Sequence, residues 1–358
     1  MLASLPGYDP NAFAGGIDTE SWKGLTTDEW EPLQNRAIQT HYPPGSVHKP
    51  IVAAGLLEDG VVTPSTRVFC PGYFRFGRRN YRCWKRAGHG SVDLVEALQK
   101  SCDVYFYTNG VKLGIDRMAH FAKSFGLGSP TGIGLAHEAP GLAPSSEWKR
   151  KRFGEPWYPG ETVSAAIGQG FNLYTPAQLA VAYAAIANGG RVLRPRLVLR
   201  LEGRDGEALR HMPVQEVGRL PVAPEHLKWV RRGLEAVVEE TGGTGGRARV
   251  PGVPIAGKTG TAQVVRLEQT EGLEDDEIPL RYRDHAWFGG FAPADAPEIA
   301  VGIFVEHGMH GSSGAAPIAQ RIMTRYFEKQ GVIEPPPLPE LVRADLPDGA
   351  GGRSGGAQ

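Results

Sequence analysis

The sequence predicts one large domain that combines α-helices with β-strands, the α/β (α+β) class. Its 358 residues exceed an average domain but suit a single large domain with insertions. Apolar residues make up 41% of the chain, which is enough for a sizeable core. Segments of helical and of strand periodicity both occur, and the strand segments come after residue 254.

Charge and apolar patterning exclude several classes of protein. Lys plus Arg and Asp plus Glu both number 39, so the formal net charge is zero and nothing favours nucleic acid or an anionic membrane surface as the main partner. No apolar run approaches the roughly 18 residues of a membrane span. The opening, MLASLPGYDP, lacks the basic and apolar regions of a signal peptide. Read literally, the sequence indicates a soluble cytosolic chain, and the alternative is a piece cut from a longer exported protein.

Turn residues and helical periodicity divide the N-terminal half. Residues 1–45 are expected to be irregular, and a helix is predicted over Ser46–Glu58 with Ser46 in its first turn. Residues 66–90, rich in aromatic residues, Arg, Gly and Cys, form a predicted loop-rich insertion. Two helices are expected next, over Val92–Lys100 and from about Val104.

The C-terminal half alternates between the two kinds of periodicity. Helices are predicted over Thr175–Ala187, Leu227–Glu240 and Ala315–Lys329, and strands from Ile255 onward, over Ala286–Phe291 and over Ile299–Val305. Residues 335–358 contain mainly Pro, Gly and charged residues, which favours a disordered tail. The predicted division is therefore a folded domain over 1–334 followed by that tail.

The first of three short motifs is Ser46-Val47-His48-Lys49. Residues i and i+3 on a helix are neighbours, so the Ser46 hydroxyl and the Lys49 amine can meet on one face. A serine becomes a nucleophile once a base takes its proton, and a lysine whose pKa is lowered can act as that base. A surface Ser and Lys on an ordinary helix would show the same spacing, so this motif alone is weak.

The other two motifs are Ser101-Cys102-Asp103 and Lys258-Thr259-Gly260-Thr261. Ser101 projects from a predicted turn, where it can relay a proton, although Ser101 or Asp103 can equally cap the next helix. Lys258 stands at a predicted strand start and can attract a carboxylate. Thr259 and Thr261 can then bind that carboxylate, while Gly260 leaves room for a substrate backbone. The order of the three motifs carries more information than any one of them.

Together these motifs resemble the penicillin-binding protein and serine β-lactamase superfamily. The resemblance is sharpest to class B enzymes of the penicillin-binding protein 2 type. It rests on the segments YPPGSVHKP at 42–50, WKRAGHG at 84–90, SCDVYFY at 101–107, IGQG at 167–170 and GKTGTAQV at 257–264. His48 departs from the pattern, where an aromatic or apolar residue is more usual.

This resemblance implies the fold, the reaction and the site. It implies a five-stranded antiparallel sheet between helices, a largely helical second lobe and an active site in the cleft between them. Ser46 would be acylated by a peptide ending in D-Ala-D-Ala or by a β-lactam, with Lys49 as general base. Ser101 and Asp103 would shape the proton relay, while Lys258, Thr259 and Thr261 would bind the terminal carboxylate. The N–H groups of Ser46 and Thr261 would form the oxyanion hole.

The same resemblance implies partners and a location for the full-length protein. Relatives carry a membrane anchor and a non-catalytic domain, and they work at the periplasmic face of the cytoplasmic membrane in cell-wall elongation. A RodA-type glycosyltransferase and MreC would be the protein partners. A D,D-carboxypeptidase or a β-lactam sensor domain would share the same motifs, so both remain open alternatives.

Three cysteines and a histidine predict a structural zinc site. Cys70, Cys83 and Cys102 are the only cysteines, and His89 lies between the last two. A Cys3His set would hold a loop-rich segment that has little apolar material of its own. A Cys70–Cys83 disulfide and three unrelated buried cysteines are the alternatives. The resemblance favours zinc, because some relatives bind it at corresponding positions.

Two other enzyme classes fit the sequence less well. Residues 252–259 formally match the phosphate-binding loop of NTPases, G-x-x-x-x-G-K-[ST]. That loop requires a helix opening at Lys258-Thr259, whereas the β-prone residues that follow predict a strand. A β-lactamase of class A would need a Glu-x-x-x-Asn loop between the second and third motifs, and none occurs there.

Overall fold

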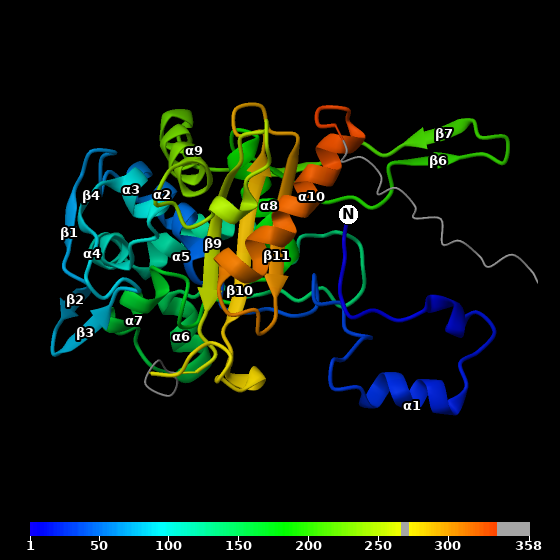
Figure 1. Ribbon diagram of the computed structural model, residues 1–358, viewed down its shortest axis with the longest axis horizontal. Coiled ribbons are helices and arrows are strands. Elements are labelled where there is room, and N and C mark those ends of the chain that lie inside the picture. The colour runs from blue at the N-terminus through cyan, green and yellow to red at the C-terminus, as the bar shows by residue number, and fades with distance from the viewer. Residues whose placement is uncertain (266–271, 335–358) are drawn as a thin grey trace, which may run out of the picture.

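A three-stranded antiparallel sheet stands between helices and beside a helical lobe (Figure 1). The computed structural model describes residues 1–265 and 272–334. The sheet has the strand order β11-β10-β9, from strands β9 (Ala256–Ala262), β10 (His285–Ala292) and β11 (Ile299–Val305). The prediction of a mixed helix and strand fold is confirmed.

The central strand β10 separates two hydrophobic clusters. Trp287 and Phe291 face the larger cluster, which includes helix α8 (Pro176–Ala187). Ala286 and Phe288 face the smaller cluster, which is closed by helix α10 (Ala316–Lys329). Because side chains alternate along a strand, one fully buried strand supplies both layers of core.

Helix α2 (Lys49–Glu58) is the axis of the helical lobe. Its residues from Lys49 to Leu57 are all buried, so it is apolar on every side. It packs closely on helix α5, where a Cβ on Gly55 would lie 2.5 Å from the Phe121 ring. Helices α3 (Leu94–Gln99), α4 (Asp103–Leu113) and α5 (Ile115–Ser124) pack against α2. Helix α7 (Pro159–Ala165) packs on α4, and α6 (Ser146–Phe153) completes the lobe.

The remaining elements complete the fold. Helix α9 (Pro224–Glu239) contacts α3 and β9. Helix α1 (Thr19–Thr27) belongs to an extended N-terminal segment, and the β6–β7 hairpin projects from the opposite end to the helical lobe (Figure 1). The short strands are β1 (Val68–Cys70), β2 (Tyr73–Phe76), β3 (Arg79–Arg82), β4 (Gly90–Val92), β5 (Arg191–Leu193), β6 (Arg200–Glu202), β7 (Ala208–His211) and β8 (Glu216–Arg219).

Three details differ from the sequence-based expectations. The main sheet has three strands rather than five in the described chain, and residues 1–44 add to it no strand but only helix α1, 3-10 turns, irregular backbone and an isolated bridge between Tyr42 and Tyr174. The segment 66–90 is not merely a loop, since cross-strand pairs such as Phe74–Tyr81 make a hairpin of β2 and β3. The helix expected from Ser46 begins as a 3-10 turn over Gly45–His48 and becomes α-helical at Lys49.

The predicted tail, residues 335–358, lies outside the described residues. Across the described part of the chain, every helix is too short or too polar to cross a membrane.

Candidate active site

The turn that carries Ser46 is pressed against strand β9. Gly45 has a φ of 55°, and a Cβ there would collide with the Thr261 carbonyl. Gly260 is equally confined, because a Cβ there would lie 2.8 Å from the Pro44 carbonyl oxygen and 2.9 Å from Val47. Gly260 therefore makes room for the chain's own Ser46 turn, a second reason for a glycine beside the predicted one that it makes room for a substrate.

Lys49 is anchored in the second motif. Its amine donates hydrogen bonds to the Ser101 carbonyl at 2.9 Å, the Ser101 hydroxyl at 3.1 Å and Asp103 Oδ1 at 2.7 Å. The Lys49 side chain is fully buried and that of Asp103 is 10% exposed. Ser46 is partly exposed, and within the described chain no hydrogen bond joins its hydroxyl to Lys49.

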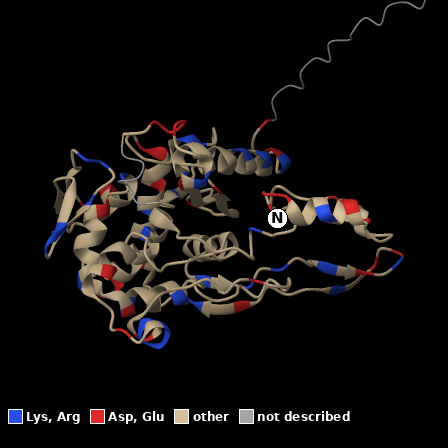
Figure 2. Ribbon diagram, turned by 90° about the horizontal axis from the view of Figure 1, so that it is seen from below, with Lys and Arg blue, Asp and Glu red and all other residues tan. Residues whose placement is uncertain are grey.

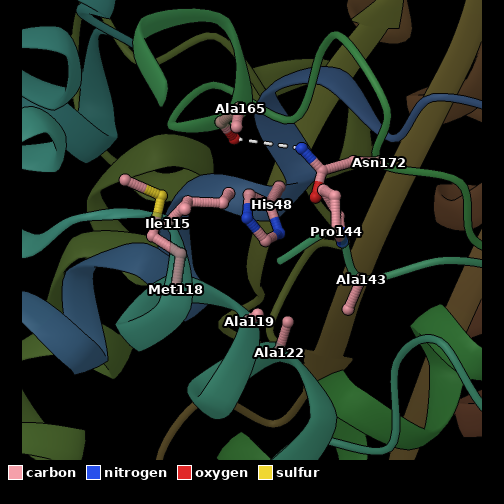
Figure 3. Close-up of a pocket in the computed structure, with 9 residues that line it drawn as sticks. All are labelled: His48, Ile115, Met118, Ala119, Ala122, Ala143, Pro144, Ala165 and Asn172. Atoms are coloured by element: carbon pink, nitrogen blue, oxygen red, sulfur yellow. Dashed lines mark hydrogen bonds between the residues drawn. The ribbon is translucent and has the colours of Figure 1, made fainter. Parts of the chain in front are cut away.

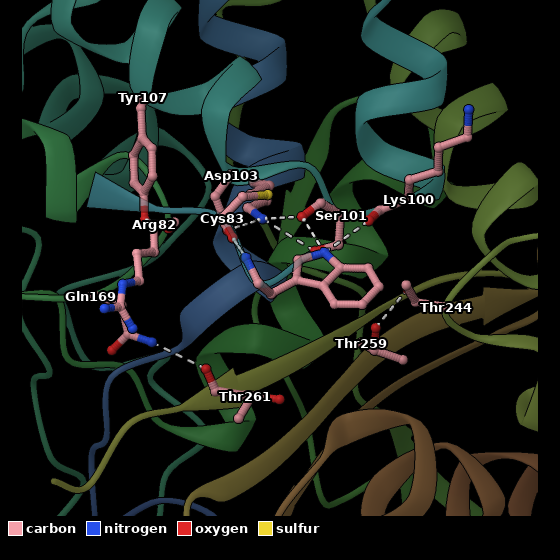
Figure 4. A network of polar contacts seen from close by, with 12 residues as sticks. Arg82, Cys83, Lys100, Ser101, Asp103, Tyr107, Gln169, Thr244, Thr259 and Thr261 are labelled. Atoms are coloured by element: carbon pink, nitrogen blue, oxygen red, sulfur yellow. Dashed lines mark hydrogen bonds and ion pairs between the residues drawn. The ribbon is translucent and has the colours of Figure 1, made fainter. Parts of the chain in front are cut away.

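Ser101 is held in an uncommon backbone conformation, with a φ of 53°. The indole of Trp84 donates to the carbonyls of Lys100 and Ser101, at 3.0 and 3.1 Å, and the Trp84 amide donates to Asp103 Oδ2 at 2.9 Å (Figure 4). These bonds fix the turn whose hydroxyl meets Lys49. The strained conformation persists because the surrounding contacts determine it.

The third motif lies inside β9. Lys258 is fully buried, and its amine donates to the Thr259 carbonyl at 3.1 Å. The Thr259 hydroxyl meets that of Thr244 at 2.8 Å, and Gln169 donates to the Thr261 carbonyl at 3.1 Å (Figure 4). Trp84, Thr244 and Gln169 were missed as contacts of the motifs. Of these three residues, Trp84 and Gln169 lie in segments that carry the family resemblance (84–90 and 167–170), whereas Thr244 does not.

Charge in this site is unevenly balanced. Lys49 and Lys258, two amines, share a buried space with one carboxylate, Asp103. Burial, and then the nearby Lys49 ammonium, holds the pKa of Lys258 well below its usual range. Burial raises the pKa of the Asp103 carboxyl, and Lys49 partly offsets that rise. One ion pair is thus favoured, with a second amine that gives up its proton readily.

His48 lies between Ser46 and Lys49 in the first motif and is buried. Its Nδ1 is 3.4 Å from the Tyr174 hydroxyl, which lies 3.1 Å from Asn172 Oδ1. Asn172 uses its amide group to donate to the carbonyls of Ala165 and Gln169. The Tyr174 hydroxyl therefore donates its proton to Asn172 Oδ1. In the contact between His48 and Tyr174, His48 Nδ1–H is then the donor and the Tyr174 oxygen the acceptor.

The His48 ring also lines a small cavity whose other walls are mainly apolar (Figure 3). The cavity has no room for a water molecule. A charged imidazole would be poorly solvated there, and burial lowers the pKa of His48 to about 3.

This burial makes the stability depend on pH. As the pH falls below 6.5 the unfolded chain binds a proton at His48, while the folded chain does so only near pH 3, so stability is lost across that window. Between pH 7 and pH 5 the wild type should lose about 2 kcal/mol more of its free energy of unfolding than His48→Phe does. Urea unfolding at the two pH values measures this difference. The exposed control His120→Gln should differ from the wild type by the same free energy of unfolding at both pH values. If the difference between His48→Phe and the wild type also stays constant with pH, His48 is not the buried neutral group that we assign.

The four predicted metal ligands converge. The Sγ atoms of Cys70, Cys83 and Cys102 and the His89 ring nitrogen lie within 4.8 Å of one another, and all three cysteines are free thiols. His89 Nδ1 is 3.7 Å from the Cys70 sulfur and 3.5 Å from the Cys83 sulfur. Zinc bond lengths of about 2.3 Å to sulfur and 2.0–2.1 Å to nitrogen place tetrahedral S and N ligands ~3.6 Å apart. The donor set therefore fits zinc in both chemistry and spacing.

The NTPase alternative is excluded by secondary structure. Lys258 and Thr259 lie in the middle of β9, paired with Gly289 and Phe288 of β10. No helix begins at these two residues, which are both described, so their amides cannot cradle a phosphate at a helix N-terminus.

Comparison with known proteins agrees with this geometry. The profile of the penicillin binding protein transpeptidase domain matches residues 1–324. The chain belongs to the penicillin-binding protein transpeptidase family. This transpeptidase domain is 37% identical over 353 residues to the peptidoglycan D,D-transpeptidase MrdA of Haemophilus influenzae, covering 97% of this chain and 52% of that protein.

Two solved structures are similar to the transpeptidase domain. Penicillin-binding protein 2 of Pseudomonas aeruginosa, in complex with WCK 5153, is 41% identical with a TM-score of 0.79, and the match covers 91% of this chain and 67% of that one. Penicillin-binding protein 2 of Helicobacter pylori, in complex with MreC, is 32% identical with a TM-score of 0.80, covering 92% and 58%. The chain spans about half the length of the curated relatives it matches.

Proposed function

We propose that this domain is a peptidoglycan D,D-transpeptidase that cross-links stem peptides through an acyl-enzyme on Ser46. The observation that carries the proposal is the contact of the buried Lys49 amine with both Ser101 and Asp103, directly after the turn that presents Ser46. A nucleophile, a base and a group that orients the base are thereby assembled in one place.

The proposed reaction has two acyl-transfer steps. The Ser46 oxygen attacks the carbonyl carbon of the D-Ala-D-Ala bond and gives its proton to Lys49. The C–N bond then breaks, and the departing D-Ala amine receives a proton through Ser101. An acceptor amine next attacks the Ser46 ester, loses a proton to Lys49 and releases Ser46. The N–H groups of Ser46 and Thr261 stabilise the oxyanion in both steps.

The site's charge balance supports Lys49 as the base. Asp103 stabilises the ammonium that forms when Lys49 takes the Ser46 proton. The low pKa of buried Lys258 leaves it ready to gain a proton when the substrate carboxylate arrives beside Thr259 and Thr261. Substrate binding therefore favours a charged Lys258 beside the substrate carboxylate.

Product analysis tests the proposal. The domain is incubated with a pentapeptide ending in D-Ala-D-Ala, with and without a peptide that carries an acceptor amine. Cross-linked dimer and free D-Ala are expected by mass spectrometry. Release of D-Ala without any dimer would identify a carboxypeptidase. Acylation by penicillin without turnover of either peptide would identify a sensor domain.

We also propose that Cys70, Cys83, His89 and Cys102 hold a structural zinc ion. His89 Nε2 is buried without a hydrogen-bond partner, so the ring is oriented by its Nδ1 contacts with the sulfurs. Cys102 lies between Ser101 and Asp103, and Cys83 precedes Trp84. The metal would therefore brace the turn that places Ser101 against Lys49, and it takes no part in the acyl transfer.

Metal analysis tests this site on protein purified without a histidine tag. We expect one zinc and three titratable thiols per denatured chain. Removal of zinc should lower both the melting temperature and the rate of acylation by penicillin, because the Ser101 turn loses its brace. A chain with no metal and one free thiol would instead show a Cys70–Cys83 disulfide.

In the full-length protein we propose a periplasmic position at the cytoplasmic membrane, with MreC and a RodA-type glycosyltransferase as partners. The similarity to a protein solved with MreC supports the first of these partners.

A further inference from the structure

A strongly basic hairpin lies next to the active site and is not used by the chemistry above. Between Pro71 and Val92 the sequence has six Arg or Lys residues and no Asp or Glu, in a chain whose formal net charge is zero. All six are exposed: Arg75, Arg78, Arg79, Arg82, Lys85 and Arg86. Like charges this close repel one another, so the segment is suited to an anionic partner.

The strand register gives this hairpin two different faces. Phe74 pairs with Tyr81, and both rings contact Tyr107 of α4, which seats the inner face on the domain. The alternate residues therefore form the outer face, where Tyr73 pairs with Arg82 and Arg75 pairs with Asn80. Arg78 lies in the turn at the tip, whereas Arg79 alternates to the inner side, where its guanidinium carbon is 5.1 Å from the centre of the Tyr81 ring. The hairpin lies at the opposite end of the molecule from the β6–β7 hairpin (Figure 1), and Figure 2 shows Lys and Arg in blue at that end.

The outer face leads into the active site. The Arg82 carbonyl accepts a hydrogen bond from the Tyr107 hydroxyl at 3.2 Å, and two residues later Trp84 bonds to Ser101 and Asp103 (Figure 4). An extended strand advances about 3.3 Å per residue, so β3 from Arg79 to Arg82 spans about 10 Å, and Trp84 follows two residues later. The strand has the length of a short extended peptide, and the chain that follows the outer face of the hairpin reaches the Ser101 turn.

We propose that the outer face of the β2–β3 hairpin binds the acceptor peptidoglycan strand through the carboxylates of its stem peptides. This inference rests on the proposed function. Arginine guanidinium groups bind carboxylates with paired, charge-assisted hydrogen bonds, and the 48% exposed Tyr73 ring offers a surface against which a sugar or peptide can lie. Continuity with the Ser101 turn favours a peptidoglycan strand over a lipid surface, because a strand held there places its amine near the acyl-enzyme.

The test uses the triple variant Arg75→Gln, Arg78→Gln and Arg79→Gln. These residues lie on the hairpin and at its tip, away from the motifs and the cysteines. We expect binding to purified peptidoglycan sacculi in a co-sedimentation assay to weaken about tenfold at low salt, since three charged contacts are lost. The matched control Arg321→Gln, Arg325→Gln and Lys329→Gln removes equal charge from exposed positions on α10 and should bind as the wild type does.

Two further arms identify the ligand. Sacculi whose carboxylates have been amidated should bind the wild type as weakly as the triple variant binds unmodified sacculi. The triple variant should also form dimer more slowly at limiting acceptor while its acylation by penicillin stays unchanged. Wild-type affinity of the triple variant for sacculi would overturn the proposal, as would selective loss of its binding to anionic phospholipid vesicles. If penicillin fails to acylate the wild-type domain, the result would instead count against the proposed function.

Discussion

Replacing Ser46 by alanine is expected to abolish covalent labelling by a fluorescent penicillin while the domain stays folded. In the proposed reaction the Ser46 hydroxyl oxygen forms the ester with the acyl group, so the alanine variant has no atom that can form it. The side chain is partly exposed and accepts or donates no hydrogen bond among the described residues, so its loss should change the free energy of unfolding by less than ~0.5 kcal/mol.

Intact-mass spectrometry and urea unfolding measure the two halves of this result. Ser65→Ala is a matched control, because Ser65 is exposed and lies outside α2, a few residues after that helix ends at Glu58. It should be labelled as the wild type is. A stoichiometric adduct on folded Ser46→Ala would show that another residue is the nucleophile.

Replacing Lys49 by methionine is expected to damage both acylation and stability, for separable reasons. The variant lacks the proposed base, and a general base contributes about 10²–10⁴ in rate. It also leaves the Asp103 carboxylate buried without its counter-ion, and breaking a buried pair costs ~3–5 kcal/mol. Urea unfolding measures the loss of stability, and the rate of penicillin acylation measures the loss of the proposed base.

The double variant Lys49→Met and Asp103→Asn separates them. Asparagine keeps an oxygen that can accept the Trp84 amide, and no unpaired charge remains. We expect most of the lost stability to return while acylation stays as slow as in the single variant. Recovery of acylation together with stability would show that Lys49 acts only through the fold.

The main helices and strands were predictable because their periodicity is strong and their ends carry clear signals. The strand β11 was predicted over the residues it occupies, and Thr175 caps α8 as expected. The 66–90 insertion was harder to predict, because its strands are only three or four residues long. Those strands form through cross-strand contacts such as Phe74–Tyr81, which depend on packing against Tyr107.

The site was predictable where chemistry requires a particular residue type at a fixed spacing. The three motifs meet in space, and so do the three cysteines and His89. Long-range contacts gave no local signal. The Thr244–Thr259 pair, the Gln169 contact with Thr261 and the reason for Gly260 depend on how distant segments approach one another. His48 stood out only as a departure from the usual pattern, and its role became visible once Tyr174 was placed beside it.

Mapping the penicillin adduct on the wild-type domain tests the central claim most directly. Trypsin cleaves after Arg36 and Arg67 but not between Lys49 and Pro50, so the labelled peptide should be residues 37–67. Fragment ions should place one penicilloyl group on Ser46. An adduct on any other residue, or no adduct on folded protein, would contradict the assignment of Ser46 as the acylated nucleophile.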